Sequence, residues 1–456
     1  MQVPRGSLWG CDNGRMRFTA TEIAAITGGS LIGPDVECNG ASIDSRSIGE
    51  GELFVPIVAD RDGHGFIGAA QAAGAAASLT SQAGVATGGT TIVVGDTGDA
   101  LAALGRAARA RHDGPVIAIT GSVAKTSVKD LTAAAIAVSR RTHASQRSFN
   151  NELGVPLTLV NAPEDAEVLV VEMGARGPGH IAYLCEIAAP TIGIVTWVGA
   201  VHTSEFGSLE AVAAAKGELV EALPSTGTAI LNVDCDLVAA MADRTDATVV
   251  TYGEAGNGAM VVAEQVRVDD QLRPRFDALI GGLRQPIALE VRGVHQVSNA
   301  LAALTAADAV GVALGDSAAA LTHAAISPWR MQLERSKSRT WILNDAYNAN
   351  AISTAAALRS LAALPADRRI AVLGVMAELG DRHDADHLAM AELCASLGVE
   401  LIAYNERAYG VESLVSHDAV IDRLDELGAD GDHVAVLVKG SRVAGLEALA
   451  ERLLAR

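Results

Sequence analysis

A lysine and a hydroxyl side chain stand together where a short apolar run meets a loop of small residues. The run VIAI, residues 116–119, leads into Thr120-Gly121-Ser122-Val123-Ala124-Lys125-Thr126-Ser127, and the helical pattern VKDLTAAAIAV follows. In such a strand–loop–helix unit, backbone N–H groups and the positive end of the helix face an anion. Lys125 would bridge the β- and γ-phosphates of a nucleotide, and the Thr126 hydroxyl would hold Mg²⁺. The segment is therefore a candidate phosphate cradle.

The loop departs from the usual GxxxxGK[ST] pattern at both glycine positions. Ile119 stands at the first and Ala124 at the second. Alanine there adds a Cβ beside the phosphates, and a positive φ at that position would cost an L-residue about 1–2 kcal/mol. An ordinary strand–helix turn with a solvated lysine is the alternative interpretation, and this segment alone does not decide between the two.

Three further side chains that can bind a metal or a ligand follow apolar runs that we expect to be strands. Glu172 ends EVLVVE, His202 follows IGIVTWVGAV, and Asp345 ends TWILND within the polar cluster NDAYNAN. Ligands bind beyond the carboxyl ends of parallel strands, where a carboxylate can coordinate a metal ion that bridges phosphates. The polar cluster could meet a ribose or a peptide. Taken singly, Glu172 is equally a solvated loop residue and the polar cluster equally an Asn-rich turn, and a lone histidine such as His202 is more often structural.

Lys216 belongs to a helical pattern rather than to a strand end. It stands in EAVAAAKGELVEAL, with Glu210 and Glu218 nearby. By default such a lysine is a surface residue with carboxylate neighbours. The pattern alone therefore assigns it no chemistry.

Three α/β units in series would position these side chains. Apolar runs alternate with Ala-rich helical patterns, and runs that are apolar on both faces are typical of parallel sheets covered by helices. In the first unit we expect a strand over 52–57, a helix over 66–78, a strand over 90–94 and a helix over 99–111. We expect four units of sequence: a disordered extension (1–15), a small N-terminal α/β domain (16–107), a central domain with a P-loop-type parallel α/β sheet (108–316) and a C-terminal Rossmann-like α/β domain (317–456).

Composition excludes several classes of protein. Lys and Arg number 35 against 54 Asp and Glu, a formal net charge of −19, which argues against a nucleic-acid-binding protein. The beginning of the chain lacks the apolar core of a signal peptide, and no run of about 18 apolar residues suggests a membrane span. The five cysteines lie far apart without a CxxC pair, as in a reducing compartment. We expect a cytoplasmic monomer.

Blocks of sequence in all three units together resemble the Mur ligase family. The first unit carries IDSRSIGEGELFVPI and DRDGHGFIGAAQAAGA. The central unit carries ITGSVAKTSVKDL, SFNNELGVPLTL, VVEMGARGPGHI, VHTSEFGSLEAVAAAKGEL and GVHQVSNALAA, and the third carries WRMQ, NDAYNAN, VLGVMAELGD and VKGSR. Any one block is weak, but their common order from about Ile43 to the C-terminus makes a chance match improbable.

The resemblance implies an ATP-dependent amide ligase of peptidoglycan precursor synthesis. The blocks are most similar to those of members that join D-alanyl-D-alanine to UDP-N-acetylmuramoyl-tripeptide. Such a ligase would use ATP to convert the peptide carboxylate into an acyl phosphate, with two Mg²⁺ ions. Its partners would be these small-molecule substrates alone.

The resemblance also implies roles for the matched residues that bind nucleotide and metal. The implied nucleotide-binding residues are Gly121, Ser122, Val123, Ala124, Lys125, Thr126 and Ser127, with Asn299 at the adenine, Arg330 at the phosphates and Asp345 at the ribose. The implied metal ligands are Thr126, Glu172, His202 and Lys216, where Lys216 would carry a carbamate that turns a cation into an anion. The implied catalytic residues are Lys125, Asn151, His202 and Lys216.

Matched residues of the outer units would bind the other substrates. Those on the uridine-binding motif of the first unit are Asp44, Ser45, Arg46, Asp62 and His64. Asn348 and Asn350 of the third unit would lie towards the incoming dipeptide.

The sequence departs from the family pattern at five positions. The departures are Ala124 for Gly, Trp197 for Asn, Asn344 for Asp, Ala351 for Pro and Val375 for Asp. They leave two alternatives open. One is a nucleotide-binding relative that no longer ligates and acts as a partner or regulator. The other is a ligase for a different amine or carboxylate, such as a folate polyglutamylating enzyme, against which the uridine-type motif argues.

Overall fold

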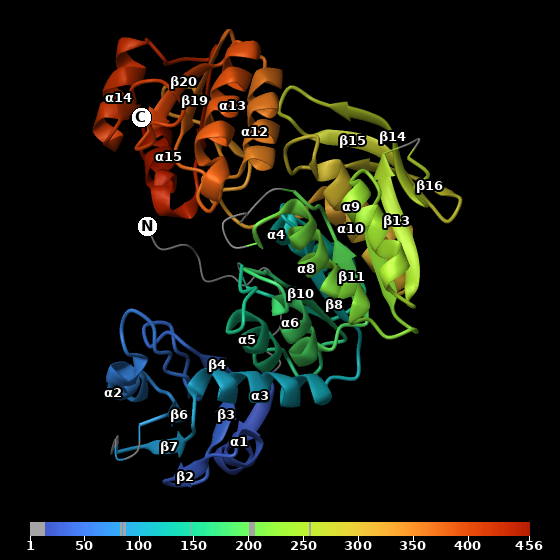
Figure 1. Cartoon of the computed structure of the whole chain (residues 1–456), viewed down its shortest axis with the longest axis vertical. Coiled ribbons are helices and arrows are strands. Elements are labelled where there is room, and N and C mark those ends of the chain that lie inside the picture. The colour runs from blue at the N-terminus through green and yellow to red at the C-terminus, as the bar shows by residue number, and fades with distance from the viewer. Residues whose placement is uncertain (1–13, 83, 85–87, 147, 200–205, 255–256) are drawn as a thin grey trace.

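The computed structural model describes residues 14–456 apart from 83, 85–87, 147, 200–205 and 255–256. Three regions follow one another along the long axis of the molecule (Figure 1), from the blue N-terminal region through the green and yellow central region to the orange and red C-terminal region. Within the described residues the strands form sheets of two, five, nine and six strands. The fold is α/β throughout, as the sequence predicts.

The N-terminal region holds the two smallest sheets. Strand β1 (Arg17–Thr19) pairs antiparallel with β3 (Glu37–Asn39), and a five-stranded sheet follows. Its order is β2 (Ser30–Ile32), β7 (Thr90–Val93), β6 (Ala77–Thr80), β5 (Leu53–Phe54) and β4 (Ala41–Ser42), with only β2 antiparallel to its neighbour. Helix α1 (Ala20–Thr27) is framed by a capping box of Thr19 and Glu22 and by left-handed Gly28.

The helix expected over 66–78 is too long. A 3₁₀ turn, η1 (Gly63–Phe66), leads into α2 (Ile67–Ala72), and strand β6 already begins at Ala77. Gly74 has a φ of +108°, which no helix accommodates, so the Ala-rich run is divided between a helix and a strand. Likewise, the apolar run 52–57 contributes only a two-residue strand.

Helix α3 (Thr97–Ala110) connects the N-terminal region to the central one. It packs against α1 on one side and against α5 (Gly154–Val160) and α6 (His180–Ala188) on the other. One continuous buried cluster consequently includes Phe18 and Leu101 as well as Val155 and Leu184. The two regions share a hydrophobic core.

The central region is a nine-stranded sheet. Its order is β16 (Leu283–Ala288), β15 (Pro274–Ile280), β14 (Val261–Val268), β13 (Thr248–Glu254), β12 (Thr228–Asn232), β11 (Ile192–Val195), β8 (Val116–Thr120), β10 (Val168–Glu172) and β9 (Thr142–Ala144). Strands β8 to β14 are parallel, as expected for a P-loop-type sheet. The phosphate-loop strand β8 lies between β10 and β11, so three strand ends converge beside the loop.

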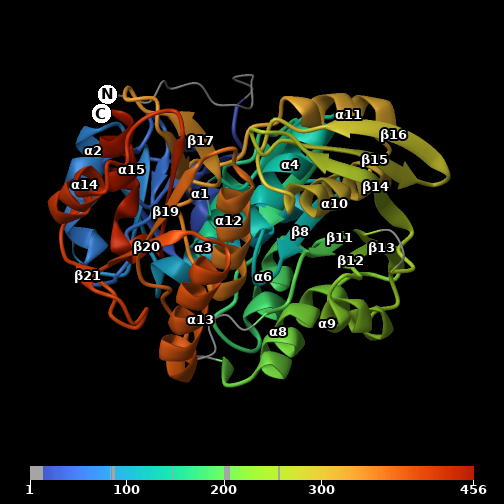
Figure 2. The same cartoon turned by 90° about the horizontal axis from the view of Figure 1, so that it is seen from above.

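Helices cover both faces of this sheet. Helix α4 (Lys125–Ala137) lies beside α10 (Gln296–Ala309) on one face, with α11 (Leu314–Thr322) next to them (Figures 1 and 2). On the other face lie α5, α6, α8 (Leu209–Glu221), α9 (Asp236–Ala239) and the 3₁₀ turn η2 (Ala240–Arg244). Alternate residues of β8 enter the two cores, because successive side chains of a strand point to opposite faces.

Strands β14, β15 and β16 form a ribbon that the sequence analysis did not anticipate. Strand β15 pairs antiparallel with both neighbours, and its side chains alternate between buried and more exposed. Gly281 and Gly282 close the β15–β16 hairpin with φ values of +58° and +82°. A Gly-Gly pair between alternating runs is the sequence signal for such a hairpin.

The C-terminal region is a six-stranded sheet between two helical layers. Its order is β17 (Gln332–Arg335), β18 (Trp341–Asn344), β22 (Val434–Lys439), β19 (Arg368–Leu373), β20 (Glu400–Tyr404) and β21 (Ser413–Leu414), and only β17 runs antiparallel. The helices are α12 (Ala351–Ala363), α13 (His383–Ser396), α14 (His417–Glu426) and α15 (Leu446–Leu454), with the 3₁₀ turns η3 (Gly380–Arg382) and η4 (Arg442–Ala444). The strand expected at TWILND is present as β18.

Among the described helices, none has the length and apolar character needed to cross a membrane. Cys38, Cys185, Cys235 and Cys394 are buried free thiols, as their spacing predicts. Cys11 lies outside the described residues. Gly14 and Arg15, part of the expected extension, are described, and Arg15 forms an ion pair with Glu52.

Candidate functional site

The candidate phosphate loop is braced against the end of β11. Gly121 has a φ of +153°, and a Cβ at this position would overlap the hydroxyl of Thr196. The Ser122 N–H donates to the Trp197 carbonyl at 2.7 Å, and the Thr196 hydroxyl donates to the Val123 carbonyl at 2.7 Å. The loop is therefore held open in one conformation by its neighbour strand.

Ala124 has the positive φ that the sequence analysis treated as the costly case. It immediately precedes α4 with a φ of +68°, a conformation that favours glycine. Its methyl group packs against the buried apolar cluster that joins β8, α4 and α10. Alanine is accommodated here at a conformational cost of about 1–2 kcal/mol.

Two lysines lie close enough to the loop to repel each other. The Lys125 Nζ donates to the Gly121 carbonyl at 2.8 Å. Desolvation lowers the pKa of Lys125, while Glu172 acts in the opposite direction. Lys216 is buried, and desolvation together with the Lys125 charge lowers its pKa to about 7. The surface-lysine interpretation of Lys216 is therefore wrong, because the whole side chain lies inside the protein.

Glu172 ends β10, and its buried carboxylate accepts a hydrogen bond at one of its two oxygens. The Asn150 side chain donates to its Oε1 at 2.7 Å, whereas its Oε2 is buried without a hydrogen-bond partner in the described part of the chain. The hydroxyls of Thr126 and Ser148 lie 3.2 Å apart. A buried carboxylate oxygen without a donor fits a hard cation such as Mg²⁺, which takes oxygen ligands.

Asn151 lies at a pocket between the N-terminal and central regions. Its Oδ1 accepts the Gly154 N–H at 3.0 Å, which holds the start of α5. The pocket has a volume of about 360 Å³. It is lined by Ile43, Ser148, Phe149, Asn150, Asn151, Leu153, Gly154, Leu157, Gly174 and Arg176. Because Asn150 binds Glu172, the pocket adjoins the candidate metal ligand.

Arg330 brings the C-terminal region to this site. Its guanidinium lies 4.0 Å from the centre of the Tyr347 ring, and its Nη2 donates to the Ser148 hydroxyl at 3.4 Å. Ser148 is also the neighbour of Thr126, so one hydroxyl links the central loop to the third region. The Arg330 Nε is buried without an acceptor among the described residues.

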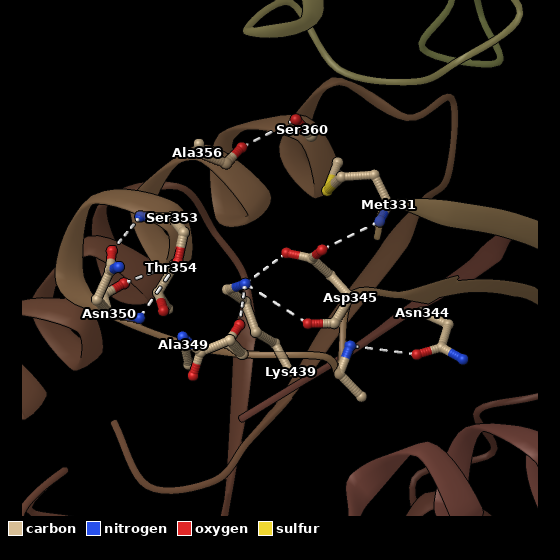
Figure 3. Close-up of polar contacts among 12 residues, drawn as sticks. Met331, Asn344, Asp345, Ala349, Asn350, Ser353, Thr354, Ala356, Ser360 and Lys439 are labelled. Atoms are coloured by element: carbon tan, nitrogen blue, oxygen red, sulfur yellow. Dashed lines mark hydrogen bonds and ion pairs between the residues drawn. The ribbon is translucent and has the colours of Figure 1, made fainter. Parts of the chain in front are cut away.

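Asp345 is held by partners of its own region (Figure 3). It forms an ion pair with the buried Lys439, and its Oδ1 accepts the Met331 N–H at 3.0 Å. Lys439 also donates to the Asn348 carbonyl at 2.9 Å. Sequence analysis did not single out Lys439, although it stands at the end of an apolar strand in the matched block VKGSR.

Asn350 acts as the cap of a helix. Its Oδ1 accepts the Ser353 N–H at 2.9 Å, and the Ser353 hydroxyl in turn accepts the Asn350 N–H at 3.2 Å (Figure 3). This reciprocal pair satisfies the first turn of α12. Its side-chain oxygen is thus already used, and any contact with a substrate falls to its NH₂ group.

Asn299 and the uridine-motif residues Asp44 and Arg46 have polar partners within their own segments. The Asn299 amide is buried in α10 and donates to the Gln296 side chain at 2.8 Å. In the N-terminal region, Arg46 binds Asp44 and holds the pKa of that carboxyl at about 2. The neighbouring Ser45 is half-buried.

His64 is the buried member of the uridine motif and has a polar contact at each ring nitrogen. The Asp62 carboxylate lies 2.6 Å from its Nδ1, and its Nε2 accepts the Ser81 N–H at 3.0 Å. These bonds define the Nδ1-protonated tautomer, which leaves the imidazole in a fixed orientation. His202, expected as a second metal ligand, lies outside the described residues.

The architecture and the matched residues define the class of protein. The model for the Mur ligase middle domain matches residues 119–307, and that for the Mur ligase glutamate ligase domain matches residues 329–442. The chain belongs to the Mur ligase family.

Particular members are similar over almost the whole chain. The UDP-N-acetylmuramoyl-tripeptide–D-alanyl-D-alanine ligase of Mycobacterium tuberculosis is 38% identical, over 96% of this chain and 98% of that protein. The Escherichia coli enzyme of the same name is 31% identical over 95% and 98%. A crystal structure of MurF from Acinetobacter baumannii superposes with a TM-score of 0.84 at 26% identity, covering 97% of this chain and 99% of that one.

Proposed function

We propose that the protein joins D-alanyl-D-alanine to UDP-N-acetylmuramoyl-tripeptide with hydrolysis of ATP to ADP and phosphate. The observation that carries this proposal is the buried Glu172 carboxylate beside the Lys125 loop, with one oxygen left without a donor. Similarity to ligases of this activity over nearly the full length supports the choice of substrates.

The reaction requires activation of a carboxylate. An anionic carboxylate resists attack by an amine, and its oxygen is a poor leaving group. In the proposed first step, a carboxylate oxygen of the tripeptide bonds to the γ-phosphorus of ATP and ADP leaves. In the second, the amine of the dipeptide attacks the acyl carbon, phosphate leaves, and the amine loses a proton. The protein contributes chiefly positioning and charge stabilisation.

The phosphate loop would hold the nucleotide. We propose that Lys125 exchanges its bond to the Gly121 carbonyl for the β- and γ-phosphates, with Gly121, Ser122, Val123, Ala124, Thr126 and Ser127 forming the cradle. Arg330 would meet the phosphates from the third region, Asp345 the ribose and Asn299 the adenine. The Arg330 Nε without an acceptor supports a role in binding an anion.

Glu172 and Thr126 would hold a Mg²⁺ ion. When bound, the ion would neutralise charge that develops on the transferred phosphoryl group. Asn150 keeps one carboxylate oxygen of Glu172 fixed, so the other keeps a defined direction. For a second Mg²⁺ we propose His202 and Lys216 as ligands, with Lys216 modified by CO₂.

The buried state of Lys216 supports that modification. Only a neutral amine adds CO₂, and a pKa of about 7 leaves a large neutral fraction at neutral pH. Carbamylation would make the Lys216 side chain negatively charged. Its repulsion from Lys125 would then become an attraction. Asn151 would lie near the reacting groups at the mouth of the pocket.

The outer regions would bind the two organic substrates. We propose that Asp44, Ser45, Arg46, Asp62 and His64 meet the uridine end of the muramoyl substrate. Asn348 and the free NH₂ group of Asn350 would meet the dipeptide. We also propose the division into units 16–107, 108–316 and 317–456, a monomer, and a cytoplasmic setting where ATP is available.

A coupled phosphate-release assay tests the function. Purified protein with ATP, Mg²⁺ and UDP-N-acetylmuramoyl-tripeptide should release phosphate only when D-alanyl-D-alanine is added, and mass spectrometry should show the pentapeptide product. A folate substrate with glutamate serves as the control for another amide ligase of the family. Nucleotide binding without dipeptide-dependent phosphate release would instead identify a relative that has lost ligation.

A further inference from the structure

Arg176 carries a positive charge at the pocket between the N-terminal and central regions. It stands four residues after Glu172, in the loop between β10 and α6, and its side chain lines the pocket with Asn150 and Asn151. The residue is exposed, and within the described ranges its guanidinium has neither a hydrogen bond nor an ion pair. The proposed function assigns it no role.

The loop that carries Arg176 is fixed at several points. The Gly174 N–H donates to the Asn150 carbonyl at 2.7 Å, which ties the two walls of the pocket together. The Arg176 N–H itself donates to the His180 Nδ1 at 3.3 Å. The arginine is therefore presented from a backbone that is already in place.

The acidic side chain that reaches this loop is occupied elsewhere. Glu218 of α8 accepts the Gly179 N–H at 2.6 Å and the Ala182 N–H at 3.0 Å, and so caps the start of α6. With its carboxylate bound to backbone amides, Glu218 does not neutralise Arg176. The backbone N–H groups at the start of α6 also have their acceptor in Glu218. The Arg176 guanidinium is therefore the cationic group of this wall of the pocket.

The rest of the pocket is uncharged. Its other lining side chains are aliphatic, aromatic, amide or hydroxyl groups, and Arg176 is the one charged residue among the described lining residues. A volume of about 360 Å³ is within the range of small-molecule sites and holds a short peptide segment rather than a whole nucleotide. A cavity lined by amides and a single cation favours a peptide that carries an anion.

We propose that Arg176 binds a carboxylate of the muramoyl peptide that does not take part in the reaction. This inference rests on the proposed function. The reacting carboxylate must approach Lys125 and Glu172, and Asn150 places that end of the pocket beside Glu172. The peptide then extends through the pocket towards Arg176, where the fork of the guanidinium fits a carboxylate.

Two carboxylates of such a peptide could fill this place. One solved relative is named for an alanyl-D-glutamyl-2,6-diaminopimelate substrate. A glutamyl residue within a chain keeps one free carboxylate, and diaminopimelate keeps a second one after its other carboxylate has reacted. Lysine as the third residue would lack the second. Arg176 thus becomes either a general anchor of the peptide or a determinant of the third residue.

Steady-state kinetics of Arg176→Ala and Arg176→Lys test the proposal, with tripeptide substrates that end in 2,6-diaminopimelate or in lysine. We expect Arg176→Ala to raise the KM for the tripeptide substrate about tenfold, the effect of losing one charge-assisted hydrogen bond, and to leave the KM values for ATP and dipeptide and kcat unchanged. Arg176→Lys should fall between the two. Exposed Arg275 in β15 provides the control substitution Arg275→Ala.

The two peptides distinguish the sources of the carboxylate. An equal rise in KM for both identifies the glutamyl carboxylate, and a rise confined to the diaminopimelate peptide identifies the distal one. An unchanged KM for both, or a loss of kcat alone, overturns the proposal. Should the wild-type protein turn over neither peptide, the proposed function fails, and calorimetric binding of the same peptides to wild type and Arg176→Ala still decides whether Arg176 holds them.

Discussion

Glu172 and Asp345 stand at the ends of parallel strands in two different sheets, yet their surroundings are opposite. Asp345 has a counter-ion in Lys439 and a backbone donor in Met331. Glu172 is more deeply buried, and among the described residues its carboxylate has a hydrogen bond from Asn150 alone, with the other oxygen left without a donor. Buried polar groups are normally satisfied within the protein. The comparison teaches that the Asp345 carboxylate is already stabilised by partners of its own region, to which a ribose would only add, whereas the bare oxygen of Glu172 depends on a ligand for its partner.

The phosphate loop should show the largest effect on turnover. Lys125→Ala removes the cation that faces the transferred phosphoryl group, so we expect kcat to fall by about 10³-fold or more. Thermal unfolding should change little, because within the described part of the chain the Lys125 Nζ has the Gly121 carbonyl as its one hydrogen-bond partner. Parallel measurement of phosphate release and melting temperature checks this. A variant that loses stability and activity together would place Lys125 in a structural network like that of Asp345.

Measurements of the free energy of unfolding test the same contrast between Asp345 and Glu172. Lys439→Met leaves the Asp345 carboxylate without its counter-ion, and we expect the free energy of unfolding to fall by about 3 kcal/mol. Glu172→Gln keeps the shape of the side chain and can keep the bond from Asn150, so unfolding should change by less than about 1 kcal/mol while turnover is lost. Urea unfolding of both variants is the test. Equal losses of stability would erase the distinction between the two strand ends.

The pH dependence of stability reports on Lys216. Its pKa in the folded protein is lowered to about 7 by burial, so the unfolded chain binds one more proton between pH 7 and the ordinary lysine pKa. Stability should therefore rise with pH through this window, by about 1 kcal/mol between pH 7 and about pH 8. Urea unfolding in CO₂-free buffer without Mg²⁺ measures the slope, and Lys216→Met should remove it. A flat profile in the wild-type protein would mean that Lys216 stays charged when buried.

The smallest effect should come from Ala124. Glycine relieves the positive φ at this position but also removes a methyl group that packs on the core, so we expect Ala124→Gly to change stability by no more than about 1 kcal/mol. Because the methyl group faces the apolar cluster, kcat should change by less than about threefold. Phosphate release beside wild type measures this. A steep rise in kcat would show that the natural loop is a weakened catalyst.

Sequence reasoning succeeded where local patterns determine the structure. The strand, small-residue loop and helix around Lys125 form as expected, and Glu172 ends its strand at the sheet edge where parallel strands place ligands. The pattern could not show that Lys216 is buried, since burial depends on what packs over α8.

Other features depend on contacts between segments far apart in sequence. Lys439 meets Asp345 only because β22 and β18 pair in one sheet, although 94 positions separate the two residues. The ribbon of β14, β15 and β16 was missed because charged residues interrupt its alternation of apolar and polar side chains. That alternation indicates a strand only when one face of the ribbon is known to pack against the protein. The Gly281-Gly282 turn was the available signal.

The buried cluster that includes both Phe18 and Leu184 affects how the regions can move and whether a fragment of the chain can fold alone. Because N-terminal and central side chains interlock in it, these two parts must unfold together rather than swing as separate bodies. The C-terminal part has more freedom to move against the other two, because among the described residues its buried clusters include only Leu272 from the central region. A fragment cut after α3 would expose the apolar surface that now meets α5 and α6, and should aggregate when produced alone.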